Sequence, residues 1–205
     1  MSTKMIAITG RSGSGKSRVA AYYRSLGYEV CDADLVAREI VQTDPDCLAL
    51  LCSRFGSDIL NEDGSLNRRL LANKAFATPE GTQALTDITH PAIIRSILRQ
   101  CEACTKEIFF VDGAVIVGHE LQKFCQKIIL VSAGDELAVQ RICSRDGISP
   151  EMAQRRLDAQ TPLAVLRAAA DYEIENTATE HQLLQQADAV LRQITDKEPY
   201  EEKTL

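Results

Sequence analysis

Residues 4–17, KMIAITGRSGSGKS, set the architecture expected for the rest of the chain. Residues 5–9 form a short apolar run with β-branched members, which predicts a buried strand. Residues 10–17 fit the pattern G-x-x-x-x-G-K-[ST], a phosphate-binding loop that follows such a strand and opens a helix. The glycines let several backbone N–H groups converge on one point, and the helix N-terminus adds positive potential there. The stretch therefore predicts a binding site for a nucleoside triphosphate.

The members of this phosphate loop (residues 10–17) have separate expected roles. Lys16 would reach the β and γ oxygens of the nucleotide, and the Ser17 hydroxyl would bind Mg²⁺. A Gly- and Ser-rich turn that fits the pattern by chance is the alternative, and the flanking strand and helix patterns disfavour it. The residues expected to bind the nucleotide are Ser12, Gly13, Ser14, Gly15, Lys16 and Ser17.

Composition narrows the class of protein. The chain has 205 residues, of which 45% are hydrophobic, so it has room for one α/β domain with insertions or two small domains. Its formal net charge is −6, only 5% of its residues are aromatic, and it has no basic block. Nucleic acids and anionic membranes are therefore poor candidate partners, and no apolar run approaches the ~18 residues of a membrane span. A small phosphorylated substrate remains compatible with this composition.

The cysteines predict a reducing compartment. There are seven of them, an odd number, and the short apolar N-terminal run leads straight into the phosphate loop rather than forming a secretory signal. They are expected to be reduced thiols in a soluble, cytoplasmic protein. Cys101 and Cys104 form a C-x-x-C pair, but no second pair or paired histidines follow at metal-ligand spacing, which disfavours a metal site.

Strand and helix patterns alternate after the loop. They predict an α/β protein with a three-layer fold like that of P-loop nucleoside triphosphate hydrolases, built on a parallel sheet of about five strands. Extended segments are expected at 28–31, 108–111, 127–132 and 172–177, and residues 187–191 suit either a helix or a strand. Helical patterns cover 17–26, 35–42, most of 43–104 with an interruption at His90-Pro91, and 135–159 with a break at 146–150; residues 199–205 are expected to fray.

Three carboxylates stand where such sheets bind ligands. Asp32 and Asp34 follow the second predicted strand, and we expect at least one of them to take part in catalysis. Helix capping by Asp34 would alone explain an aspartate there, and both roles can hold for the pair. Asp112 ends the strand at 108–111, the usual form of the second Mg²⁺-ordering element in phosphate-loop enzymes.

Arginines concentrate in the helical stretch after the strand at 127–132. Arg141 and Arg145 are four residues apart and so share one helix face. They could close over a triphosphate and neutralise its charge, or they could pair with nearby acids on a solvated helix. Spacing alone leaves both interpretations open.

Together these residues resemble the dephospho-coenzyme A kinase family over nearly the whole chain. The loop GRSGSGKS is similar to the family's GGIGSGKS, and residues 30–38, VCDADLVAR, are similar to its more specific V-x-D-A-D-x-x-A-R. Further matches are Phe55-Gly56, residues 63–68, His90-Pro91, Gln140-Arg141, residues 145–147, Ala159-Gln160, Asp171 and Asn176.

The resemblance implies transfer of the ATP γ-phosphoryl group to the ribose 3′-hydroxyl of dephospho-coenzyme A. It implies Asp34 as the favoured base with Asp32 beside it, and Lys16 and Arg141 as groups that stabilise the transferring charge. Mg²⁺ would lie on Ser17 and Asp112. Acceptor binding would fall to Asp32, Arg38, Arg68 and His90, and Asn176 would lie near the adenine of ATP.

The resemblance also implies one kinase domain over residues 1–205, as a monomer or weak homo-oligomer. Its core would comprise about 1–42, 106–140 and 176–198, with an acceptor-binding helical insertion at 43–105 and a lid at 141–175.

This chain departs from the family pattern at several positions. Arg11 and Ser12 replace Gly and Ile in the loop, and Arg18 replaces Thr. The family's P-L-L-x-E appears as Ala-Val-Ile-Val-Gly at 114–118, beside the expected acceptor site. Two alternatives therefore stay open: a kinase for another hydroxyl acceptor such as a nucleoside, and a nucleotide-binding regulator without catalysis.

Overall fold

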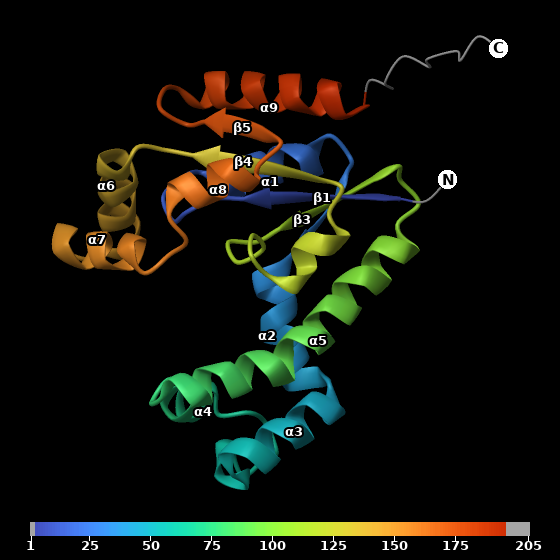
Figure 1. Ribbon diagram of the computed structural model, residues 1–205, viewed down its shortest axis with the longest axis vertical. Coiled ribbons are helices and arrows are strands. Elements are labelled where there is room, and N and C mark those ends of the chain that lie inside the picture. Colours follow the sequence, from blue (N-terminus) through green and yellow to red (C-terminus); the bar gives the residue numbers. More distant parts are fainter. Residues whose placement is uncertain (1–2, 196–205) are drawn as a thin grey trace.

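A five-stranded parallel sheet forms the centre of the protein, whose computed structural model describes residues 3–195 (Figure 1). The strand order is β2-β3-β1-β4-β5, and every neighbouring pair runs parallel. The apolar runs become strands because both faces of a parallel sheet are covered by helices. The strands are β1 (Lys4–Thr9), β2 (Glu29–Asp32), β3 (Ile108–Asp112), β4 (Lys127–Ser132) and β5 (Tyr172–Glu175).

Helices cover both faces of this sheet, which confirms the predicted three-layer α/β fold (Figure 1). Side chains alternate along β1, so that Met5 and Ala7 enter one hydrophobic cluster while Ile6 and Ile8 enter the other. The first cluster is closed by α5 (Pro79–Ala103) and α8 (Leu163–Ala169), the second by α1 (Lys16–Ser25) and α9 (Glu180–Thr195).

The chain between β2 and β3 forms a helical insertion that projects from the sheet (Figure 1). It has its own hydrophobic cluster, in which Leu51, Ile59 and Ala75 are fully buried. The insertion comprises α2 (Ala33–Thr43), α3 (Pro45–Phe55), the 3₁₀ turn η1 (Ser57–Ile59), α4 (Arg68–Ala75) and the first part of α5. The helical character expected for 43–104 is confirmed.

The predicted interruption at His90-Pro91 is wrong, because α5 runs through both residues without a break. Proline removes one backbone donor from the helix, which weakens it but does not forbid it. The Pro91 ring is exposed, while Ala92 and Ile97 on the following turns are buried in the insertion and the sheet cluster respectively. Packing of the turns that follow the proline against two different clusters therefore holds the helix together.

Two short helices after β4 pack on one another as a hairpin. They are α6 (Asp135–Asp146) and α7 (Pro150–Asp158), and the predicted break at 146–150 is confirmed. Ser149 caps α7 by accepting from the Met152 N–H, with Pro150 at the first helical position. Ile142 and Leu157 are fully buried between the two helices. We call residues 135–160 the α6–α7 hairpin.

The C-terminal elements complete the fold. The range 141–175 expected for the lid includes a sheet strand, because β5 pairs with β4. Residues 187–191 are helical within α9, and the 3₁₀ turn η2 (Glu120–Phe124) precedes β4. The fraying expected for 199–205 concerns residues outside the described part of the chain. Within residues 3–195, no helix combines the length and apolarity needed to cross a bilayer.

Candidate active site

The phosphate loop lies at the carboxyl end of β1, the middle strand of the sheet, and opens onto a cavity of about 540 Å³. Its shape depends on glycine at two positions. Gly13 and Gly15 have φ angles of 77° and 93°, which other residues rarely adopt. A Cβ atom on Gly15 would also overlap the side-chain amide of Asn176. The loop can therefore follow this path only with glycine at these places.

Arg141 and Asn176 hold the loop by hydrogen bonds to its backbone carbonyl oxygens. The buried Asn176 amide donates to the Ser14 carbonyl oxygen at 2.8 Å. Arg141 donates to the Gly13 carbonyl oxygen at 3.1 Å, and to the backbone and side-chain oxygens of Asn176 at 3.2 and 3.3 Å. Both residues line the cavity, so they are placed to touch a nucleotide as well as to support the loop.

Lys16 makes an ion pair with Asp112, at the end of β3. The Asp112 side chain is only 7% exposed. Burial raises its pKa, and the Lys16 ammonium opposes that rise. Asp32 stands beside Asp112 on the neighbouring strand, and its charge adds to the rise. The buried Asp112 carboxylate therefore holds the Lys16 ammonium in place at the loop, and any cation bound nearby would stabilise its negative charge.

Asp32 and Asp34 have different places in the structure. The helix begins at Ala33, so Asp32 is the N-cap of α2 and accepts from the Leu35 N–H at 2.9 Å. The expectation that Asp34 caps this helix is therefore wrong, because α2 begins at residue 33 and not at the predicted residue 35. Asp34 lies in the first turn of α2 and lines the phosphate-loop cavity.

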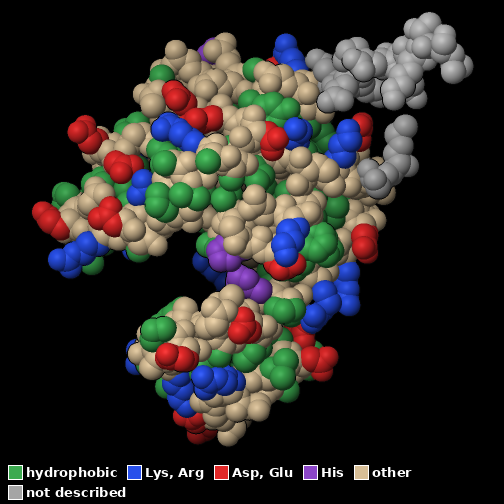
Figure 2. Space-filling model, viewed as in Figure 1, with side chains coloured by type: hydrophobic (Ala, Val, Ile, Leu, Met, Phe, Trp, Pro, Cys, Tyr) green, Lys and Arg blue, Asp and Glu red, His purple; other side chains and the backbone are tan. Residues whose placement is uncertain are grey.

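Asp34 also lines a second cavity of about 230 Å³, whose walls are mostly apolar. His90 and His119 contribute its other polar side chains, with their ring centroids 5.6 Å apart in an edge-to-face arrangement. Burial and the neighbouring His119 hold the pKa of His90 below its usual value, while Asp87 opposes this. Figure 2 shows histidine side chains at the inner end of the notch between the sheet and the helical insertion.

Sequence reasoning missed His119. It follows the altered segment 114–118 and belongs to no motif, and only the folding of that segment against α5 brings it to His90. The segment itself separates the two cavities, since Ala114 lines the first and Val115 the second.

Arg38 and Arg68, expected to bind acceptor phosphates, lie together on the insertion. Arg68 donates to the Arg38 backbone carbonyl at 2.6 Å, and both side chains are exposed. Neither is among the residues that line the two cavities. The structure thus brings these two residues together, with Arg38 one helical turn after Asp34 on α2.

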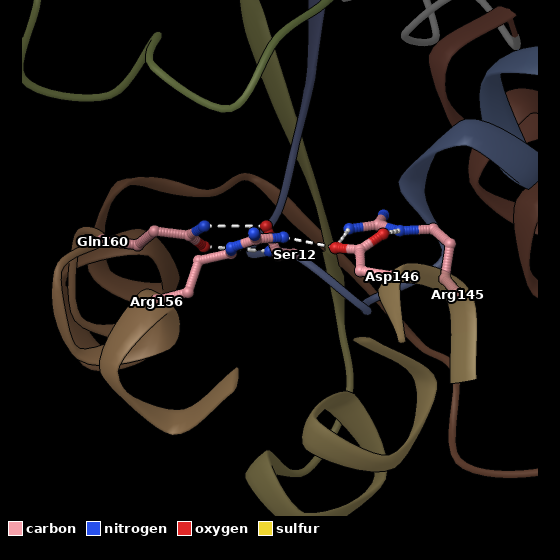
Figure 3. A network of polar contacts seen from close by, with 5 residues as sticks. All are labelled: Ser12, Arg145, Asp146, Arg156 and Gln160. Atoms are coloured by element: carbon pink, nitrogen blue, oxygen red, sulfur yellow. Dashed lines mark hydrogen bonds and ion pairs between the residues drawn. The ribbon is translucent and has the colours of Figure 1, made fainter. Parts of the chain in front are cut away.

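The α6–α7 hairpin supplies a second arginine to the phosphate-loop cavity. Arg145 lines it and pairs with Asp146 at 2.7 and 2.9 Å, and Arg156 pairs with the same carboxylate (Figure 3). These guanidinium groups, Arg145 first, hold the pKa of Asp146 at about 2. Arg145 is exposed, so it can exchange this carboxylate for a phosphate at little cost.

The donor set fits Mg²⁺. Ser17, in the first turn of α1, and Asp34 present oxygen atoms to the same cavity, and the Asp112 carboxylate lies behind Lys16. Mg²⁺ prefers oxygen ligands and takes one or two carboxylates, completing its shell with phosphate and water. Within the described residues, no three His, Cys, Asp or Glu side chains form a metal-binding group, and Mg²⁺ at a nucleotide needs none.

The arrangement suits the transfer of a phosphoryl group from one cavity to the other. Backbone N–H groups of the loop, Lys16 and four arginines line the first cavity. The arginines are Arg11, Arg18, Arg141 and Arg145. The second cavity has apolar walls and hydrogen-bonding imidazoles. Asp34 lines both cavities, so its carboxylate can orient a hydroxyl group in the second cavity towards a terminal phosphate in the first.

Known proteins similar to this chain carry a common name. A family model described as dephospho-CoA kinase matches residues 4–182. A dephospho-CoA kinase of Corynebacterium jeikeium is 39% identical over 186 residues, covering 89% of this chain and 95% of that protein. One of Syntrophotalea carbinolica is 36% identical over 193 residues, with 93% and 92% covered.

Solved structures agree with the fold. A Thermus thermophilus protein superposes with a TM-score of 0.81 at 31% identity, covering 95% of this chain and all of that one. Dephospho-CoA kinase from Campylobacter jejuni has a TM-score of 0.63 at 29% identity, with 94% and 97% covered. Shikimate kinase from Acinetobacter baumannii, at 18% identity, a TM-score of 0.54 and coverage of 94% and 93%, shares the fold alone.

Proposed function

The chain belongs to the dephospho-CoA kinase family, and from that premise we propose that it phosphorylates the ribose 3′-hydroxyl of dephospho-CoA. ATP supplies the γ-phosphoryl group, and the products are CoA and ADP. The observation that carries the proposal is the position of Asp34, which lines both the phosphate-loop cavity and the histidine-lined cavity.

In this proposal the triphosphate of ATP occupies the phosphate-loop cavity. The N–H groups of residues 13–17 surround the phosphates, and Lys16 turns from Asp112 to the β and γ oxygens. Arg141 and Arg145 supply positive charge from the α6–α7 hairpin, and Arg141 is joined to Asn176, our proposed neighbour of the adenine. The site thus aligns the phosphoryl group and disperses its negative charge.

The acceptor hydroxyl enters from the histidine-lined cavity. Asp34 accepts its proton as the new P–O bond forms and the bond between the γ-phosphorus and the bridging oxygen breaks, releasing ADP. His90 is held towards its neutral form, so it offers both a donor and an acceptor, which suits hydroxyl groups better than phosphates. Arg38 and Arg68 are left for the acceptor's phosphates, outside the cavity. Asp32, as the cap of α2, orients the turn that carries Asp34.

Ser17 and Asp112 are the residues that would hold Mg²⁺. When bound, the ion neutralises charge on the phosphate oxygens. The buried Asp112 carboxylate, which pairs with the Lys16 ammonium in the structure, would be compensated by either cation, so Lys16 could contact the phosphates without leaving that carboxylate unpaired. We further propose a cytoplasmic enzyme that works as a monomer or weak homo-oligomer.

A coupled assay of ADP release tests the function. Purified protein is supplied with ATP and Mg²⁺ and with dephospho-CoA, adenosine or uridine in separate reactions, and the product phosphate is located by ³¹P and ¹H NMR. We expect turnover with dephospho-CoA alone and a phosphate on the 3′-oxygen. Turnover on uridine would assign a different acceptor. Measurable ATP binding without turnover on any coenzyme A precursor would indicate a regulator.

A further inference from the structure

The two residues at which this phosphate loop departs from the family pattern both contact the α6–α7 hairpin. The Arg11 guanidinium donates to the Asp135 carboxylate at 2.9 Å and to the Leu157 carbonyl oxygen at 2.8 Å. Asp135 lies in the first turn of α6 and Leu157 in the last turn of α7. One side chain of the loop therefore joins both helices of the hairpin, and a glycine at position 11 could make neither contact.

Ser12 makes a second, two-point contact with the hairpin. Its backbone N–H donates to the Gln160 side-chain oxygen at 2.9 Å, and its hydroxyl accepts from the Gln160 amide at 2.7 Å (Figure 3). The Ser12 N–H is therefore committed to Gln160 rather than to a nucleotide. An isoleucine at position 12 would keep the backbone contact and lose the hydroxyl.

Burial makes the Arg11 contacts consequential. The side chain is 12% exposed, and its Nε is buried without an acceptor among residues 3–195. A buried guanidinium is costly unless its charge is paired, so removal of either acceptor leaves a charge uncompensated. The Leu157 carbonyl also stands at the negative end of the α7 dipole, which favours a cation there. The guanidinium end of this contact is therefore shielded from water, while the Asp135 carboxylate is 52% exposed.

The hairpin also carries the arginines of the phosphate-loop cavity. Arg141 and Arg145 lie on α6, the helix whose first turn holds Asp135. Because α6 is rigid and packs on α7, fixing its first turn and the end of α7 fixes the arginines as well.

We propose that Arg11 is a positioning residue which, with Ser12 and Gln160, holds the α6–α7 hairpin on the phosphate loop before nucleotide binds. This inference rests on the proposed function, since it concerns the nucleotide site of that enzyme. As a consequence, the α6–α7 hairpin already lies against the nucleotide site in the protein without ATP. The apparent Kd of a ligand equals its intrinsic Kd divided by the fraction of protein in the competent state, so loosening the hairpin raises the Kd of ATP.

Two variants remote from the cavity test this inference. Asp135→Asn and Gln160→Ala remove hairpin partners that do not line the phosphate-loop cavity. We expect each of these two to raise the Kd of ATP, measured by calorimetry, by about fivefold or more, with kcat at saturating ATP within about twofold of wild type. Arg11 itself lines the cavity, so Arg11→Ala is expected to raise the Kd of ATP as well, and its kcat does not test the inference. Arg11→Lys keeps one charged contact and should lie between wild type and Arg11→Ala.

Hydrogen exchange supplies a readout that does not involve ATP contacts. In the nucleotide-free protein, amides of α7 should exchange faster in the three variants than in wild type, and saturating ATP should restore their protection. Arg192→Ala, which removes an exposed ion pair on α9, is the matched control and should change neither measurement.

The outcomes separate this inference from the proposed function. Unchanged α7 exchange in Asp135→Asn and Gln160→Ala overturns the inference, and so does an unchanged Kd for ATP in both. If Arg11→Ala fails to fold, these two variants still decide it. Absence of ATP binding by the wild-type protein would instead contradict the proposed function.

Discussion

Replacing Asp34 by asparagine should reduce turnover strongly while leaving ATP binding intact. The substitution keeps the size and polarity of the side chain but removes its ability to take up a proton. General bases contribute about 10²- to 10⁴-fold to rate, which is about 3–5 kcal/mol of activation free energy. Asp34 stands at both cavities rather than within the loop that cradles the phosphates, so the ATP affinity should change by less than about threefold.

The fold should survive this change. Asp34 lies in the first turn of α2, where a negative charge stabilises a helix by about 0.3–1 kcal/mol. Loss of that charge is therefore the main cost, and it is small beside the expected change in activation free energy. Urea unfolding of both proteins measures it directly.

Asp32→Asn is the matched control for this variant. It removes the same charge two residues earlier, and asparagine caps helices about as well as aspartate, so the cap on Leu35 is retained. The assay compares kcat at saturating ATP and dephospho-CoA for the two variants, together with the Kd of ATP by calorimetry. We expect Asp34→Asn to lose far more turnover than Asp32→Asn.

Two results would refute this reasoning. Turnover of Asp34→Asn within about threefold of wild type would remove Asp34 as the base. Loss of turnover in Asp32→Asn equal to that in Asp34→Asn would move the catalytic role to Asp32 or to the charge of the whole turn.

Three further perturbations test other parts of the site. Lys16→Ala should weaken ATP binding and lower kcat together, because the ammonium contacts the phosphates both in the bound ground state and in the transition state. An unchanged ATP affinity measured by calorimetry would contradict this. Gly15→Ala should destabilise the fold by about 1–2 kcal/mol or more in urea unfolding, since φ is 93° and the new Cβ meets Asn176; a neutral effect would count against the loop geometry. Burial and His119 hold the pKa of His90 below 6.5, so the unfolded chain takes up this proton first and stability falls as the pH drops below about 6.5. His119→Ala should reduce the loss between pH 7.5 and 5.5, and an equal loss in both proteins would exclude the coupling.

Local patterns were sufficient to predict the sheet and the phosphate loop. The strand at 127–132 agrees residue for residue with β4, because an apolar β-branched run has few alternatives in a buried parallel sheet. The start of α7 was also predictable, since Ser149 and Pro150 act through their own backbone neighbours. Such features depend on contacts within a few residues of the chain.

Features that depend on distant contacts were not predictable. Proline at 91 predicts a break, yet packing of Ala92 and Ile97 on different clusters carries α5 through it. The start of α2 lies two residues before the predicted one, which makes Asp32 the helix cap in place of Asp34 and is within the usual uncertainty of element boundaries. His119 became visible only where its segment folds against α5.

The two departures from the family pattern have unequal consequences because the two cavities are supported differently. At residues 11–12 the substituted side chains find acceptors and donors on the α6–α7 hairpin, so the change adds contacts around the donor phosphates. Residues 114 and 115 of the altered segment instead lie between the cavities, with Val115 59% exposed, while Ile116 and Val117 are buried in the core. A wall of small apolar residues shapes a cavity but directs few hydrogen bonds, so selection of the acceptor rests on the few polar groups around it. Nucleotide binding therefore depends on contacts that the substituted residues 11–12 have added, whereas acceptor recognition depends on the few polar groups around the second cavity.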